Sequence, residues 1–250
     1  MDLKQYQIDL NADVGEGINN EAFMMPYISS CNIACGGHAG NEVTMLKVLK
    51  LAKDYDVKVG AHPAFPDKEN FGRVKIEMPR EELFKSLKLQ VYTLIELSAK
   101  AGCRVTHLKP HGALYNLAVN EYNYAEIIID VILDINPDLK LYAPHKSVVA
   151  QLAKKSGVGV IFEGFADRSY NNDLTLVDRS QPNAIIITPE KICKRVLKMI
   201  TEHEVETISG LLKPITVNTI CVHGDTNNAI EILRQLHEFL ISKNIKIGTV

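Results

Sequence analysis

Short apolar runs alternate with longer segments of helical periodicity along the chain. The runs short enough to be strands are residues 6–12, 31–35, 57–61, 104–109, 139–143, 158–162 and 218–222. The segments with an apolar residue every three or four positions are residues 41–54, 80–101, 122–135, 146–156, 189–203 and 226–242. Strands that alternate with helices in this way are typical of βα units and of a parallel sheet.

Two of the predicted helices show a face and an end most clearly. Residues 80–101 carry Leu83, Leu87, Val91 and Leu94 on one face. Gly102 follows directly and is placed to end that helix, because glycine adopts the left-handed conformation of a helix C-terminus easily. Residues 41–54 place Val43, Leu46 and Leu49 on one face. We expect Asn41 to cap that helix, which should begin near residue 42.

About seven βα units follow one another with no linker or low-complexity segment. We therefore predict one domain, residues 1–250, folded as a (β/α) barrel with fewer than eight regular strands. A doubly wound open sheet is the alternative, but neither GxGxxG nor GxxxxGK[ST] occurs in the sequence, which weakens its nucleotide-binding versions. Residues 204–217 contain Gly210 and Pro214 between β-branched residues and predict a loop or hairpin.

Composition narrows the class of protein further. The chain has 250 residues, 46% of them hydrophobic, and a net charge of −2, so its overall balance gives no sign of a nucleic-acid partner. No apolar run approaches the ~20 residues that span a membrane, and we see no signal peptide at the N-terminus. Five scattered cysteines form no disulfide framework. We expect a cytoplasmic protein with reduced thiols and no membrane partner.

Ionisable residues follow the predicted strands. In parallel α/β folds the functional loops leave the carboxyl ends of the strands. The polar residues at these ends are Asn11, Asp13, Glu16, His38, His62, Lys109, His111, Glu163, Asp167, Arg168, His223 and Asp225. Glycines beside several of the histidines let the chain turn sharply at a strand end, so we expect the imidazoles to face the mouth of the barrel.

Each residue also has a structural interpretation. A single histidine after a strand is often a hydrogen-bonded structural group, and Asp13 and Asp225 are candidates for helix caps. Asp167 and Arg168 are candidates for an ordinary ion pair at the rim. Burying so many ionisable groups together is costly unless they are paired or used, and this favours one shared active site.

Seven sequence blocks carry a family resemblance. They are "IDLNADVGEG", "NIACGGHAG", "VGAHPAFPD", "NFGR", "HLKPHGALYN", "FADRSY" and "ICVHGD", in this order over nearly the whole chain. The chain resembles the LamB/YcsF family, that of the A subunit of bacterial ATP-dependent 5-oxoprolinase. The resemblance implies a distorted seven-stranded (β/α) barrel of the glycoside hydrolase and deacetylase kind. It also implies hydrolysis of 5-oxoproline to glutamate with cleavage of ATP, and partner subunits B and C.

Three positions depart from the family pattern. Asn41 stands where Asp is usual, Val74 where Arg is usual, and Gly37 where an aromatic residue is common. The first two changes remove an acid and a base from loops at the mouth, which bears on substrate choice.

The implied reaction assigns roles to the strand-end residues. A lactam is a poor electrophile with a poor leaving group, and phosphorylation by ATP would activate it for attack by water. Asp13 or Glu16 is then the base, and His62 or His223 is the acid. Lys109 and Arg168 suit phosphate or the substrate carboxylate. The remaining candidates for substrate or phosphate binding are Asn11, His38, His111, Asp167 and Asp225.

Two other functions fit the same residues. Related barrels that deacetylate sugars hold a divalent metal with one Asp and two His, and Asp13, His62 and His111 are candidates for such a set. That enzyme would hydrolyse an amide without ATP. The chain is alternatively a substrate-delivery or scaffold subunit. In every version we expect Asp13 just past the first strand, facing the mouth, where replacement by Asn costs at most about 1 kcal/mol of stability.

Overall fold

Seven parallel strands form a closed barrel in the computed structural model, which describes residues 5–249. The barrel strands, in order around the barrel, are β1 (Gln7–Val14), β2 (Ser30–Ala34), β3 (Lys58–His62), β4 (Val105–Leu108), β5 (Lys140–Pro144), β6 (Val160–Phe165) and β9 (Thr219–Cys221). Strand β9 pairs with both β6 and β1 and so closes the barrel. The predicted distorted barrel of about seven parallel strands is confirmed.

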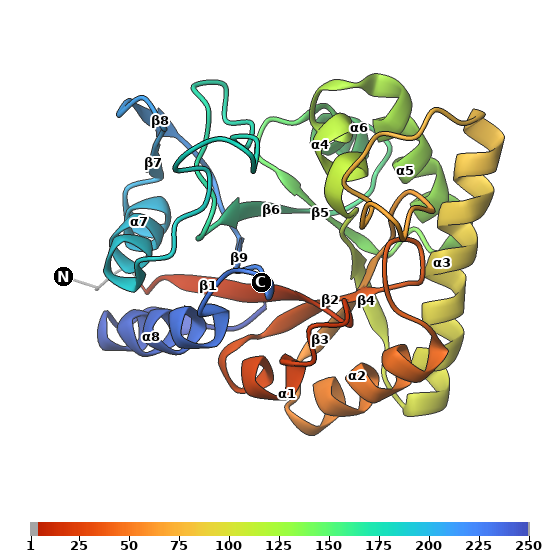
Figure 1. The fold of residues 1–250 in the computed structure, drawn as a ribbon, viewed down its shortest axis with the longest axis horizontal. Coiled ribbons are helices and arrows are strands. Elements are labelled where there is room, and N and C mark those ends of the chain that lie inside the picture. Colours follow the sequence, from red (N-terminus) through yellow and green to blue (C-terminus); the bar gives the residue numbers. More distant parts are fainter. Residues whose placement is uncertain (1–4, 250) are drawn as a thin grey trace.

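Helices surround the strands (Figure 1). They are α1 (Glu21–Met24), the 3-10 helix η1 (Met25–Tyr27), α2 (Glu42–Asp54), α3 (Arg80–Ala101), α4 (Gly112–Asn120), α5 (Tyr122–Ile135), α6 (Val148–Lys155), α7 (Pro189–Thr201) and α8 (Ala229–Ser242). The remaining strands are β7 (Glu204–Glu206) and β8 (Leu212–Pro214), which form an antiparallel hairpin, and β10 (Lys246–Ile247), which pairs with the start of β1. Among the described residues, no helix combines the length and the apolar character needed to cross a bilayer.

The predicted helices agree with the structure except at one face. Helix α3 buries Leu83, Leu87, Val91 and Leu94 as predicted, and Gly102 ends it with φ +70° in the left-handed region. Helix α2 begins after Asn41, whose side chain accepts a hydrogen bond from the backbone N–H of Thr44, so the predicted cap is confirmed. The prediction for Val43 is wrong, because its side chain is 78% exposed. The buried face of α2 consists of Met45, Val48, Leu49 and Ala52.

Strand β1 is longer than predicted, and this changes the position of its polar residues. It extends to Val14, so Asp13 lies inside the strand and is buried rather than just past the strand at the surface. The residues of β1 alternate: Leu10 and Ala12 belong to the apolar core, while the polar residues between them contact polar groups of other strands. The predicted surface position of Asp13 is therefore wrong.

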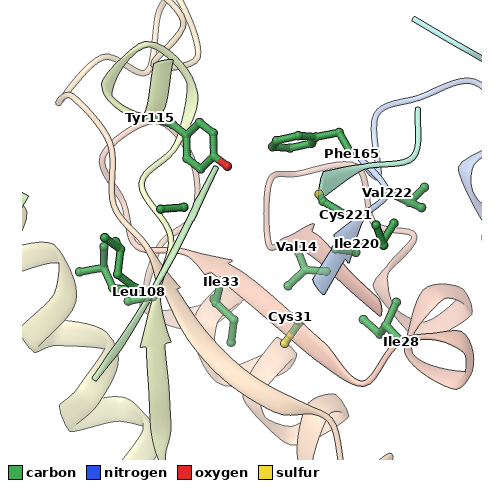
Figure 2. Close-up of a cluster of buried hydrophobic side chains, with 14 of the residues drawn as sticks. Val14, Ile28, Cys31, Ile33, Leu108, Tyr115, Phe165, Ile220, Cys221 and Val222 are labelled. Atoms are coloured by element: carbon green, nitrogen blue, oxygen red, sulfur yellow. The ribbon is translucent and has the colours of Figure 1, made fainter. Parts of the chain in front are cut away.

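Polar layers fill the barrel interior at its lower end. Asp9 accepts hydrogen bonds from the hydroxyl groups of Ser29, Ser30, Thr219 and Tyr142, at 2.6 to 3.1 Å. Above this layer, a Cβ on Gly60 would lie 2.1 Å from Nε2 of His107, so only glycine lets the imidazole lie against β3. Apolar side chains gather elsewhere around the strands (Figure 2).

Candidate active site

A cavity of about 510 Å³ opens at the carboxyl ends of the strands. The predicted site residues that line it are Asp13, Glu16, His62, Lys109, His111, Arg168, His223 and Asp225. Three other predicted residues lie behind this lining and contact it. Asn11 contacts Glu163, His38 contacts Glu16, and Asp167 contacts His223. The structure thus gathers the predicted residues from five strands and their loops at one end of the barrel.

Lys109 lies between two carboxylates in the wall of the cavity. Its Nζ is 2.9 Å from Oδ1 of Asp13 and 2.9 Å from Oε1 of Glu163. Burial disfavours all these charges, but for Lys109 the attraction of Asp13, Cys221 and Glu163 outweighs burial and holds the pKa well above its usual value. The charges of His62 and Lys109 likewise overcome the burial of Asp13 and hold its pKa well below the usual value. Both groups are ionised, so Asp13 is a poor base and Lys109 a fixed cation.

Hydrogen bonds support this ion pair from below. Asn32 donates from Nδ2 to Oδ1 of Asp13 and to Oδ1 of Asn11, both at 2.8 Å, and its Oδ1 lies 2.9 Å from Nε2 of His107. Asn11 donates to Glu163 at 3.0 Å. The amides have partners on both sides, so the carboxylates are held in fixed positions.

Sequence reasoning gave no role to Glu163, Asn32 or Tyr115. The hydroxyl of Tyr115 donates to Oε2 of Glu163 at 2.8 Å, and its ring meets Phe165 edge-on with centroids 5.7 Å apart (Figure 2). The strict alternation of apolar and polar residues in "QIDLNADV" was a signal for an inward-facing polar row. No comparable signal marks Tyr115, because α4 was not predicted and only the fold brings it to Glu163.

Glu16 and three histidines form a second polar group, called here the His–Glu cluster: Glu16, His38, His62 and His111. Oε1 of Glu16 lies 2.9 Å from Nε2 of His38 and 3.3 Å from Nδ1 of His111. Burial and the negative charge of Asp13 raise the pKa of Glu16 to about 7, and burial lowers the pKa of His38 to about 4.

Glycines place His38 in this cluster. Gly36 and Gly40 flank the histidine loop with φ +95° and +81°, in the left-handed region. A Cβ on Gly40 would also lie 2.6 Å from the carbonyl oxygen of Ala34. The tight glycine turn therefore brings His38 back over the end of β2, in agreement with the predicted presentation of histidines at strand ends.

His223 and Asp167 form an oriented pair at the other side of the cavity. Nδ1 of His223 lies 2.9 Å from Oδ1 of Asp167, and Thr226 donates its hydroxyl to Oδ2 of Asp167 at 2.6 Å. Burial opposes ionisation of Asp167, but the charge of His223 and these hydrogen bonds outweigh it and lower the pKa of Asp167. An ionised Asp167 accepts from Nδ1–H, which leaves Nε2 of His223 free to take up or give a proton. The ion pair of Asp167 lies with His223 and not with Arg168, so the rim pair considered above is wrong.

Arginines surround the opening of the cavity. Arg73 and Arg179 both contact Oδ2 of Asp225, at 2.5 and 2.9 Å. Arg168 donates from Nη2 to the carbonyl oxygen of Val177. Burial and the positive charge of Arg179 lower the pKa of Arg168 to about 10, so it remains a cation at neutral pH. The rim therefore offers positive charge to an anionic ligand.

Neither Asp13 nor Asp225 caps a helix, so that alternative is wrong for both. Asp13 lies within β1, and Asp225 binds the two rim arginines. The residue at the N-terminus of α8 is Asn228, which makes no side-chain cap hydrogen bond.

The predicted metal set, Asp13, His62 and His111, fits the structure only in its two histidines. Asp13 already holds the ammonium group of Lys109. Glu16, by contrast, has its Oε1 3.3 Å from His111 and 3.8 Å from His62. Carboxylate and imidazole nitrogen are ordinary ligands of divalent transition metals. The structure therefore favours Glu16 over Asp13 as the carboxylate of such a set.

The three departures from the family pattern lie outside the cavity lining. Asn41 is the exposed cap of α2, and Val74 is half exposed. A Cβ on Gly37 would lie 2.3 Å from Oε1 of Gln90, which also bonds both backbone polar groups of Ala64. Gln90 thus occupies the space beside Gly37 where relatives carry a large side chain.

Comparison with known proteins places the chain among related sequences of the same length. The A subunit of 5-oxoprolinase from Pyrococcus horikoshii is 42% identical over 248 residues, covering 96% of both chains. The A subunit of 5-oxoprolinase from Haemophilus influenzae is 39% identical over 241 residues, covering 96% of this chain and 98% of the relative.

Solved structures agree with the barrel. The lactam utilization protein from Thermus thermophilus superimposes with a TM-score of 0.92 at 33% identity, covering 98% of this chain and 100% of that one. The T48 deacetylase has a TM-score of 0.51 at 14% identity, covering 98% of this chain and 89% of that one, and shares the fold. Residues 8–250 match the LamB/YcsF family model, and the chain therefore belongs to the LamB/YcsF family.

Proposed function

We propose that the chain is the A subunit of an ATP-dependent 5-oxoprolinase, which hydrolyses 5-oxoproline to glutamate with cleavage of ATP to ADP and phosphate. Relatives at about 40% identity bear the name of the A subunit of 5-oxoprolinase. The observation that carries the proposal in this chain is the Asp167–His223 pair in a cavity with a cationic rim. This combination suits proton transfer next to an anionic substrate.

The reaction requires activation of an amide and one mobile proton. Transfer of the γ-phosphoryl group of ATP to the lactam oxygen makes the ring carbon electrophilic. Water then adds to that carbon while Nε2 of His223 takes its proton. The ring C–N bond breaks as His223 returns the proton to the nitrogen, which leaves an acyl phosphate. Hydrolysis of the acyl phosphate gives glutamate and phosphate. One oriented histidine therefore serves as base and then as acid.

The other residues bind and position. The arginines at the rim, Arg73, Arg168 and Arg179, suit the substrate carboxylate and the phosphate groups. Lys109 stays charged between its two carboxylates and supplies a fixed positive potential in the cavity wall. Subunits B and C, which the names of the relatives imply, complete the proposed complex.

The test is glutamate release from 5-oxoproline by the chain mixed with its B and C subunits, with and without ATP. His223→Asn keeps a donor near Asp167 in place of Nδ1 but removes Nε2, and we expect turnover to fall roughly 100-fold or more. His203 provides the matched control, since it is exposed, has φ +58° that Asn adopts well, and does not line the cavity. Normal turnover of His223→Asn would contradict the assigned role and favour a delivery or scaffold subunit.

A second candidate function is metal-assisted amide hydrolysis without ATP. The convergence of Glu16, His62 and His111 favours it. Glutamate release, or acetate release from an N-acetyl sugar, that needs no nucleotide and stops with a chelator would support this function over the first.

A further inference from the structure

The His–Glu cluster brings ligand atoms together in one small volume. Its four residues each offer an atom within 4.8 Å of the others, and its three histidines are buried. Glu16, His62 and His111 also line the cavity, so their shared centre has one side open to it.

Backbone carbonyls fix the tautomers of two of the rings. Nδ1 of His62 lies 2.7 Å from the carbonyl oxygen of Lys109, and Nε2 of His111 lies 2.9 Å from that of Phe71. A carbonyl oxygen only accepts, so these two nitrogens carry the hydrogens. The neutral rings then direct the lone pairs of His62 Nε2 and His111 Nδ1 at each other across 2.9 Å. Such a contact requires an electropositive centre beside it. Imidazoles that ligate metals are oriented by carbonyl acceptors in this same manner.

The separations of the ligand atoms fit a divalent cation. The three distances among Glu16 Oε1, His62 Nε2 and His111 Nδ1 are 2.9, 3.3 and 3.8 Å. Ligand atoms at about 2.1 Å from one ion lie roughly 3.0 Å apart in octahedral and about 3.4 Å apart in tetrahedral geometry. A shared proton would organise two atoms, whereas here a carboxylate oxygen joins the two nitrogens.

His38 has a different position. Its ring is stacked on that of His111 with centroids 3.6 Å apart and planes within 1°. Parallel rings direct their lone pairs side by side, so they do not converge on one ion. Nε2 of His38 lies 2.9 Å from Oε1 of Glu16, where it orients the carboxylate.

We infer that Glu16, His62 and His111 bind one divalent transition-metal ion, with His38 positioning Glu16. Bound there, the ion would supply Lewis acidity at the cavity wall. The other potential ligand group, Asp13, Cys221 and His223, does not fit, because Nζ of Lys109 lies 2.9 Å from Asp13 and 3.2 Å from Cys221. A second cation so close to the ammonium group would be repelled. This site does not depend on the lactam being the substrate.

The experiment measures binding of Zn²⁺ and Co²⁺ to the chain freed of metal by a chelator, by calorimetry and by the visible spectrum of Co²⁺. The wild type should bind one equivalent. Glu16→Gln and His111→Asn should weaken binding by roughly 100-fold or more, and His38→Gln by about 10–100-fold, as outer-shell changes do. Asp13→Asn and His223→Asn should bind nearly as the wild type does.

No binding of either ion by the wild type would overturn the inference. So would loss of binding in His223→Asn with retention in Glu16→Gln, since this would place the ion at the other group. Circular dichroism of each variant without metal checks the fold. If a variant fails to fold, wild-type crystals soaked in Co²⁺ decide the matter. An anomalous peak among the three ligand atoms supports the site, and a peak elsewhere or none refutes it. Because binding is measured alone, failure here is distinct from failure of the lactamase assay.

Discussion

Replacement of Asp13 by Asn tests whether the buried ion pair is a structural as well as a functional element. Asn fits the site without loss of a hydrogen bond. Its Oδ1 accepts from Asn32 and Lys109 as Oδ1 of Asp13 does at 2.8 and 2.9 Å. Its amide nitrogen then faces Nε2 of His62, which lies 3.4 Å from Oδ2 of Asp13 and accepts in the tautomer fixed by the backbone. The substitution therefore removes a charge and little else.

The magnitude follows from the opposing contributions of that charge. At an effective dielectric constant of about 20, unit charges 2.9 Å apart attract by roughly 6 kcal/mol. Against this stands the desolvation of a buried carboxylate, several kcal/mol, which Asn avoids. Lys109 also keeps Glu163 as a partner at 2.9 Å. We expect a net loss of about 2 kcal/mol, or a fall of roughly 4–8 °C in thermal midpoint for a chain of this size.

The assay pairs the thermal midpoint of the isolated chain with glutamate release by the reconstituted subunits. Turnover should fall roughly 100-fold or more, because the charge pattern of the cavity wall changes. The same substitution at Asp56, which is exposed with φ +54°, is the control and should leave both values unchanged. An unchanged or higher midpoint for Asp13→Asn would refute the argument that the pair stabilises the fold.

Three further predictions concern residues around the site. Asn41→Asp should change stability by no more than a few tenths of a kcal/mol and leave turnover unchanged, because this exposed side chain caps α2 in either form. Gly37→Ala should destabilise the wild type by about 1–3 kcal/mol but cost less in a Gln90→Ala background, as a double-mutant cycle in urea would show, since Gln90 fills that space. The pKa of Asp167 lies below its ordinary value of 3.8, so its ionised form contributes stability above that pH and loses it as the pH falls through the folded pKa. The advantage of the wild type over Asp167→Asn in thermal midpoint should therefore shrink below about pH 4, unlike that over His223→Asn at constant pH.

The barrel could be predicted because its signals are local. Apolar runs of strand length, helical periodicity between them and glycines at helix ends follow from backbone geometry within a few residues. Helix α3 shows this best, since its face and its end at Gly102 are both where the sequence placed them. Val43 shows the limit. An apolar residue with helical spacing is not always buried, because the direction of the face is set by the sheet that the helix packs on.

The mouth of the barrel could also be predicted, but not the partners within it. That strand-end residues gather at one end follows from parallel strands alone. Which carboxylate pairs with Lys109 depends on residues 96 and 54 positions away, Asp13 and Glu163, and on the register of four strands. Arg73 and Arg179 reach Asp225 from long loops whose path no periodicity describes.

The division of labour between Asp13 and Glu16 shows why residue type alone does not assign a role. The two carboxylates are three positions apart and are interchangeable as candidate bases in the sequence. In the structure the pKa of one is held low because Lys109 and His62 lie against it, and the pKa of the other is raised because it is buried beside the first. Asp13 lies on a strand that points it down toward Lys109, while the turn after Val14 carries Glu16 across to His38 and His111. Opposite environments therefore arise from one change of backbone direction, and this makes Asp13 part of the barrel's fixed charge and Glu16 a free ligand for a cation.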